Sequence, residues 1–272
     1  MNLEEKFQEL KRKREGAHMA HVYYGDPNEE FSLNLIETLA ENGADIIEFG
    51  IPFSDPTADG PTFQAVCERA LRNGITPKKC IRGIGEARKM GLENPIVVTT
   101  YYNIPYIIGV GTFLKKIREA GAQAIIIPNV PIEEADFLLT EGKKRGVHVI
   151  FQIAPTTTED RLKNIAHFAS GFLYIISVEG VTGVRVSLAN STLKLVQRVR
   201  RHTDMPLLAG FGISSRHQAS AVVAAGANGA IAGSAYAKVY EKNLKNPEET
   251  LPEIARLVEQ IKQGCIEGYK QR

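Results

Sequence analysis

The sequence predicts an α/β fold, in which a single (β/α)8 barrel occupies residues 1–272 and includes an extra helix at its N-terminus. Short apolar runs rich in β-branched residues alternate along the chain with longer segments of helical periodicity. Eight such runs can be counted. Alternating strands and helices imply parallel strands joined by right-handed crossovers, and eight such units close into a TIM barrel. A doubly wound open sheet is the alternative, although that fold rarely has eight units.

The predicted elements follow one another along the whole chain. An amphipathic helix is expected at about Leu3–Arg14, before the first strand. The predicted strands are His18–Tyr23, Asp45–Phe49, Ile96–Thr100, Ala124–Ile127, Val147–Ile153, Phe172–Ile176, Pro206–Ala209 and Gly229–Ala232. Several helical segments between them end in glycine, which often terminates helices, and LPEIARLVEQIKQG predicts a last helix before a frayed tail. Because no linker, repeat or low-complexity segment interrupts this order, we expect one domain.

The composition excludes several classes of function. The hydrophobic share of 43% and the charged share of 24% are those of an ordinary globular protein. A net charge of +2 provides no strong field for binding nucleic acid or a membrane surface. No apolar run approaches the roughly 18 residues that span a bilayer. The charged N-terminus MNLEEKFQELKRKRE is unlike a signal peptide, so we expect a cytoplasmic protein.

The cysteines and histidines do not lead to a predicted metal site. Cys67, Cys80 and Cys265 lie far apart, and we interpret them as free thiols in a reducing compartment. Packing or surface roles are expected for His148, His167, His202 and His217. The cysteines have no metal-ligand spacing, and no metal site is predicted from the sequence.

Residues 44–64 carry the strongest functional signal. Glu48 lies near the end of an apolar predicted strand, and Asp59 follows eleven positions later on a loop rich in glycine and proline. Burying an ionised carboxylate without a partner costs several kcal/mol, so such a residue is normally paired or used. Two carboxylates that face each other across a pocket, one with its pKa raised by burial and one ionised, can act as an acid/base pair. Glu48 and Asp59, placed in this way, would form such a pair.

The motif EFGIPFSDPTADGPTFQ at positions 48–64 resembles the signature of the tryptophan synthase α subunit family, and the similarity runs from about Glu4 to Glu241. In that family the corresponding glutamate and second aspartate are the catalytic pair. The resemblance implies retro-aldol cleavage of indole-3-glycerol phosphate to indole and glyceraldehyde 3-phosphate, in tryptophan biosynthesis. It implies no cofactor. It also implies a β subunit partner in an α2β2 assembly, although the segment YYNIPYIIGVG, in a region that contacts that subunit, departs from the family pattern.

Three glycine-bearing turns, at residues 177–183, 210–215 and 233–234, follow the sixth, seventh and eighth predicted strands. Backbone N–H groups in such turns bind a phosphate dianion without a lysine, and barrels of this kind often bind phosphate near strands 7 and 8. Alternatively, the glycines only form tight turns. By resemblance, the phosphate-binding residues are Gly183, Gly212, Gly233 and Ser234. We therefore expect a phosphorylated small molecule as substrate.

The ends of the predicted strands also supply the walls of a substrate pocket. The predicted pocket residues are His21, Thr99, Tyr101, Asn129, Gln152, Tyr174 and Phe211. The histidine, threonine and glutamine stand where the family usually has apolar residues, and the asparagine replaces an aspartate. Polar walls without partners disfavour an apolar ring. Two alternatives stay open: a paralogue with the same acid/base pair and phosphate site that acts on a more polar phosphorylated substrate, and a non-catalytic partner that only regulates a β subunit.

Overall fold

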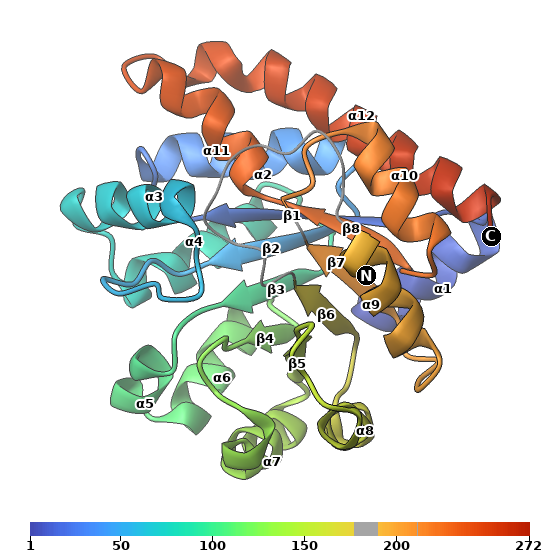
Figure 1. Ribbon diagram of the computed structural model, residues 1–272. Helices are drawn as coiled ribbons and strands as arrows, with labels where there is room; N and C mark the ends of the chain where they lie inside the picture. The colour runs from blue at the N-terminus through green and yellow to red at the C-terminus, as the bar shows by residue number, and fades with distance from the viewer. Residues whose placement is uncertain (177–189, 211) are drawn as a thin grey trace.

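The computed structural model describes residues 1–176, 190–210 and 212–272. Eight parallel strands pair in sequence order, and β1 also pairs with β8, which closes the barrel seen at the centre of Figure 1. The strands are β1 Ala17–Tyr23, β2 Ile46–Gly50, β3 Ile96–Thr99, β4 Ala124–Ile126, β5 His148–Ile153, β6 Leu173–Ile176, β7 Leu207–Gly210 and β8 Gly229–Ala232. Each bound lies within one residue of its predicted position, so the barrel prediction is confirmed.

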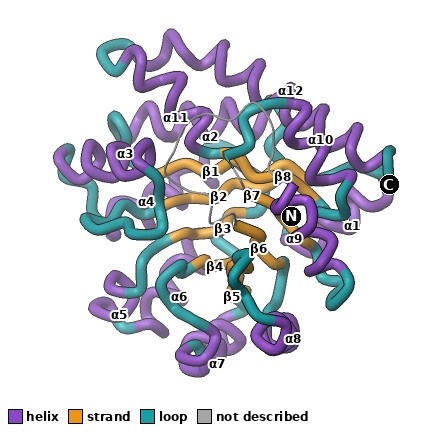
Figure 2. The backbone as a smooth tube through the Cα atoms, viewed as in Figure 1, coloured by secondary structure: helices purple, strands orange, loops and turns teal. Residues whose placement is uncertain are grey.

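Helices surround the strands on all sides, as Figure 2 shows by colour. The α-helices are α1 Leu3–Lys13, α2 Glu29–Glu41, α3 Pro61–Arg72, α4 Pro77–Lys89, α5 Asn103–Ile108, α6 Val110–Ala120, α7 Asp136–Arg145, α8 Glu159–Phe168, α9 Asn190–Arg200, α10 Arg216–Ala224, α11 Ser234–Tyr240 and α12 Leu251–Lys270. Short 3-10 helices occupy Ile132–Glu134, Glu241–Asn243 and Pro247–Thr250. Within these described residues, no helix is long and apolar enough to cross a membrane.

The N-terminal helix α1 closes one end of the barrel. It begins with a capping box, in which the Asn2 side chain accepts a hydrogen bond from the Glu5 backbone and the Glu5 carboxylate accepts one from Asn2. Its apolar face buries Leu3 and Leu10 in the cluster that fills the barrel interior. The Phe7 ring packs edge-on against Phe172. Because α1 fills this end, a substrate must enter from the carboxyl ends of the strands.

The last helix, α12, is longer than predicted and runs beside α10 along one side of the molecule (Figure 1). The expected frayed tail is helical as far as Lys270. Two glycines explain the close approach, since a Cβ atom on Gly264 or Gly268 would collide with backbone carbonyl oxygens of α10. The apolar contacts made possible by this approach hold the end of the chain in place.

The alternation of side chains along each strand brings the predicted polar residues into the barrel. Met19 of β1 and Ile46 of β2 belong to the interior cluster, so His21 and Glu48, two residues further along, face the same interior. The parallel register sets His21 directly beside Glu48. Thr99 lies at the end of the next strand, β3. These strand ends therefore form one polar sector at the open end of the barrel.

Candidate active site

Glu48 is buried at the end of β2, with 2% of its surface exposed. Its Oε1 atom accepts a hydrogen bond from the Thr99 hydroxyl at 2.5 Å, and His21 Nδ1 lies 3.5 Å from the same oxygen. Oε2 has no hydrogen-bond partner among the described residues. Burial raises the pKa of Glu48 to about 8, the Thr99 hydroxyl opposes that rise, and the negative charge of Asp59 adds to it. Near neutral pH Glu48 is therefore a protonated acid.

Asp59 lies on the loop between β2 and α3, where a turn joins its backbone N–H to the Pro56 carbonyl at 3.0 Å. Its Oδ2 atom accepts hydrogen bonds from the Tyr23 hydroxyl at 2.8 Å and the Tyr101 hydroxyl at 2.7 Å. The Tyr101 oxygen in turn accepts the Ala58 N–H at 3.0 Å. Burial raises the pKa of Asp59, whereas the hydrogen bonds from Tyr101 and Tyr23 lower it. The two hydroxyls thus favour the ionised form of this carboxylate.

Aromatic rings surround the two carboxylates. Tyr174 is buried on β6, and its pKa is raised by burial first and then by the charges of Glu48 and Asp59. A Cβ atom at Gly210 would lie 2.8 Å from the Tyr174 hydroxyl oxygen, so glycine leaves room for this ring. Phe63 of α3 packs against His21, with ring centroids 4.6 Å apart. Aromatic rings therefore line the pocket beside the polar groups at the strand ends.

His21 faces the barrel interior, as predicted, and is buried. Burial lowers the pKa of its imidazole to about 3, so the ring is neutral over the physiological pH range. Its Nε2 atom has no hydrogen-bond partner among the described residues. The ring thus contributes a polar edge near Glu48 without contributing a charge.

Two predicted pocket residues lie further round the barrel. Asn129 follows β4, and its side-chain oxygen accepts a hydrogen bond from the Tyr102 backbone at 2.9 Å. Gln152 lies at the end of β5. Both line a cavity of about 300 Å³ over the ends of β4 and β5, whose lining also includes Ile176 of β6. These polar groups border the open end of the barrel, and neither forms a hydrogen bond to Glu48 or Asp59 in the described region.

The predicted phosphate residues are only partly described. Gly212 has φ of 63°, a left-handed conformation that favours glycine, and no atom of the described residues lies within 4 Å of the position of a Cβ atom there. A Cβ atom at Gly233 would lie 2.6 Å from the Phe63 ring and 2.9 Å from His21 Cβ. This close approach places the Gly233-Ser234 turn beside the aromatic wall. Gly183 and Phe211 lie outside the described residues.

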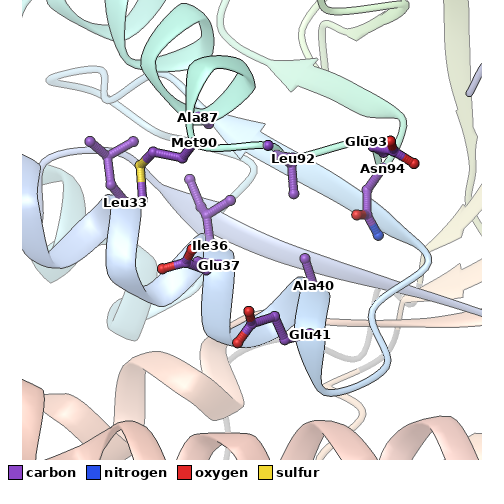
Figure 3. Close-up of a pocket in the computed structure, with 11 residues that line it drawn as sticks. Leu33, Ile36, Glu37, Ala40, Glu41, Ala87, Met90, Leu92, Glu93 and Asn94 are labelled. Atoms are coloured by element: carbon purple, nitrogen blue, oxygen red, sulfur yellow. The ribbon is translucent and has the colours of Figure 1, made fainter.

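A separate groove of about 300 Å³ lies between α2, α4 and the turn that leads into β3 (Figure 3). Apolar side chains such as Leu33, Ile36 and Met90 line it together with Glu37, Glu41 and Glu93. It precedes β3, so it lies toward the opposite end of the strands from Glu48. Among the residues that the structure describes, no group of three or more histidine, cysteine, aspartate or glutamate residues could hold a metal ion.

Comparison with known proteins identifies the family. The family model for the tryptophan synthase alpha chain matches residues 7–266. The chain belongs to this family. A tryptophan synthase alpha chain of Methanosarcina mazei is 44% identical over 98% of this chain and 95% of the relative. One from Methanocaldococcus jannaschii is 46% identical over 90% and 86%. The recognition made from the motif at 48–64 is thereby confirmed.

Solved structures of the same family share the fold. The crystal structure of the tryptophan synthase alpha chain from Legionella pneumophila has a TM-score of 0.88 at 28% identity and covers 97% of both chains. A tryptophan synthase structure from Mycobacterium tuberculosis has a TM-score of 0.87 at 31% identity, again over 97% of each chain. The alpha chain family therefore accounts for the whole barrel of this protein.

Sequence reasoning did not identify Tyr23 as part of the site. Its hydroxyl reaches Asp59 from the end of β1. The signal was available in principle, because Tyr23 lies two positions after His21 and strand alternation sends both residues to the same face. What the sequence did not provide was the position of the loop that carries Asp59.

Proposed function

We propose that this member of the tryptophan synthase alpha chain family cleaves indole-3-glycerol phosphate to indole and glyceraldehyde 3-phosphate, with Glu48 and Asp59 as its catalytic groups. The observation that carries the proposal is the contrast between two neighbouring carboxylates. Burial raises the pKa of Glu48 to about 8; burial also raises the pKa of Asp59, but hydrogen bonds from the Tyr101 and Tyr23 hydroxyls oppose that rise and favour its ionised form. One group can therefore give a proton while the other accepts a hydrogen bond.

The reaction follows from these protonation states. The Glu48 carboxyl donates its proton to the indole carbon that carries the glycerol phosphate chain, and positive charge develops at the ring nitrogen. Asp59 accepts the hydrogen bond of that N–H and stabilises the charge. The Glu48 carboxylate then takes the proton of the adjacent hydroxyl. The carbon–carbon bond breaks, its electron pair returns to the ring, and the hydroxyl carbon becomes the aldehyde. Each proton transfer contributes about 10²- to 10⁴-fold.

The phosphate group would orient this substrate. We assign it to the glycine turns at Gly183, Gly212 and Gly233, together with Ser234, since the carboxyl ends of strands 6 to 8 surround the same opening as Glu48. Backbone N–H groups there can hold a dianion without a cationic side chain. A bound phosphate would keep the ring against the aromatic wall formed by Tyr174 and its neighbours.

Product formation tests this proposal. The purified chain, incubated with indole-3-glycerol phosphate, should release indole, and Glu48→Gln should lower the rate by at least about 100-fold because the amide can neither donate nor accept the proton. Glu37→Gln, an exposed glutamate on α2 lining the groove in Figure 3, is the matched control and should keep the wild-type rate. Equal rates in Glu48→Gln and wild type would refute the role given to Glu48.

A tryptophan synthase β subunit is the proposed partner, in a cytoplasmic α2β2 assembly. This proposal is supported by α5, which presents Tyr106 and Ile107 to solvent with 67% and 83% of their surfaces exposed. The helix follows β3 at the open end of the barrel. Adding a β subunit should raise the rate of indole formation. Ile107→Asp should abolish the increase, whereas Phe137→Asp, another exposed apolar residue, should preserve it.

The paralogue with a more polar substrate has less support. It predicts that His21 and Gln152 point into the pocket and form hydrogen bonds to the substrate. His21 Nδ1 lies 3.5 Å from Glu48 Oε1, so the histidine also has a role beside the acid when the substrate is indole-3-glycerol phosphate. Gln152 lines the cavity over β4 and β5 with Asn129. The regulatory alternative does not account for the buried Oε2 atom of Glu48, which has no hydrogen-bond partner in the part of the chain that the structure describes.

A further inference from the structure

Each of the two carboxylates is held through one oxygen. Glu48 Oε1 accepts the Thr99 hydroxyl, while Oε2 has no partner among the described residues. Asp59 Oδ2 accepts both Tyr23 and Tyr101, and no described residue donates to Oδ1. The donors come from strands on both sides of β2, because Tyr23 ends β1, and Thr99 and Tyr101 lie at the end of β3. This arrangement fixes the carboxylates and leaves one oxygen of each unoccupied by these donors.

We propose that Thr99 and Tyr23 are positioning residues, each of which fixes one oxygen of a carboxylate so that the other oxygen of Glu48 or Asp59 faces the substrate. The inference rests on the proposed function and assigns roles to two residues that act through the catalytic pair. Thr99 selects the oxygen of Glu48 that carries the transferred proton. By binding Oδ2, Tyr23 selects Oδ1 as the Asp59 oxygen that accepts the hydrogen bond of the ring N–H.

The surroundings of Tyr23 support a positioning role. Its ring centroid lies 5.0 Å from that of His21 and 5.2 Å from that of Phe63. Phe63 belongs to the first turn of α3, only four residues after Asp59. Contact with both rings holds the tyrosine between β1 and the start of α3. Its hydroxyl therefore ties the Asp59 loop to the barrel wall.

Both hydroxyls also bias protonation. A hydrogen bond donated to a carboxylate stabilises its ionised form and lowers its pKa. The hydrogen bond from Thr99 lowers the pKa of Glu48 and is the main influence that opposes the rise caused by burial. Tyr23 acts with Tyr101 on Asp59. Removing either hydroxyl should therefore raise the pKa of one carboxylate only, which separates a positioning role from a general loss of structure.

Isosteric variants test the inference. Thr99→Val should move the alkaline limb of the kcat/KM profile for indole formation upward by about one pH unit, because the Glu48 acid loses a donor to its anion. Tyr23→Phe should move the acid limb upward, since Asp59 must be ionised. In both variants kcat should fall about tenfold, with KM changed less than about twofold. Thr99→Ser, which keeps the hydroxyl, should restore the wild-type alkaline limb.

Neighbouring residues supply matched controls. Thr100→Val removes a buried hydroxyl that has no partner among the described residues, and Tyr24→Phe removes one that contacts Glu29 at 3.3 Å. Both controls should keep the wild-type profile. A wild-type protein that forms no indole would refute the proposed function itself. An active wild type whose limbs do not move in Thr99→Val and Tyr23→Phe would overturn this inference alone, as would equal shifts in the controls.

Discussion

The buried acid at Glu48 should make the protein less stable as pH rises. Its pKa is about 8 in the folded protein and about 4.5 for the exposed group, so between these values the folded state holds a proton that the unfolded chain has lost. This contribution to the free energy of unfolding is fully present below pH 4.5. It falls progressively as pH rises and is lost once pH passes about 8. A difference of about 3.5 pKa units corresponds to roughly 5 kcal/mol, of which about 3 kcal/mol is already lost at pH 7.

Glu48→Gln removes this titrating group, so a comparison of the variant with the wild type measures its contribution to stability. Urea unfolding of the variant and the wild type at a series of pH values from 4.5 to 9.5 gives the difference in the free energy of unfolding. The free energy of unfolding of the variant should rise relative to that of the wild type by roughly 1.4 kcal/mol per pH unit up to about pH 8. Above that pH the difference should stay constant. Glu37→Gln should show no such gain, since that side chain is exposed. A constant difference between Glu48→Gln and wild type across the range would contradict the buried, protonated state.

Three further variants test other parts of the structure. Asp26→Asn weakens a buried carboxylate's paired hydrogen bonds from Arg69, both at 2.7 Å, and should lower the free energy of unfolding by about 3 kcal/mol in urea titrations. Gly233→Ala inserts a Cβ atom 2.6 Å from the Phe63 ring, so we expect a raised KM for the phosphorylated substrate and a lower melting temperature. Leu3→Ala should lower the free energy of unfolding by about 2–5 kcal/mol but preserve kcat, because α1 closes the end of the barrel away from the site. A large fall in kcat would contradict that placement.

The strands could be predicted closely because their signal is local. A buried parallel strand is a short apolar run, and its limits are marked by polar and glycine residues on either side. The same reasoning identified Glu48, whose charge interrupts such a run. The strand order then follows from the chirality of the crossovers. The end of α12 was missed because Gly264 and Gly268 suggest a frayed helix unless the neighbouring α10 is known to lie against them.

The contacts inside the site could not be predicted in this way. Thr99 and His21 were expected to line the pocket, but their approach to the same Glu48 oxygen depends on the stagger between strands. The bond from Tyr23 to Asp59 depends on how the loop before α3 folds back over the barrel. Asn129 lies in a cavity with Gln152, away from the hydrogen bonds of the carboxylates, which only the three-dimensional arrangement reveals.

The most direct test of the central claim is the pH dependence of kcat/KM for indole release from indole-3-glycerol phosphate. With Glu48 as the acid, the rate should be sustained near neutral pH and fall above about pH 8, tenfold for each further unit, as the carboxyl loses its proton. The Asp59→Asn variant should be slow at every pH, because its amide does not carry the charge that stabilises the ring nitrogen. A rate that stays level to pH 10, or an Asp59→Asn variant as fast as the wild type, would contradict the acid/base pair.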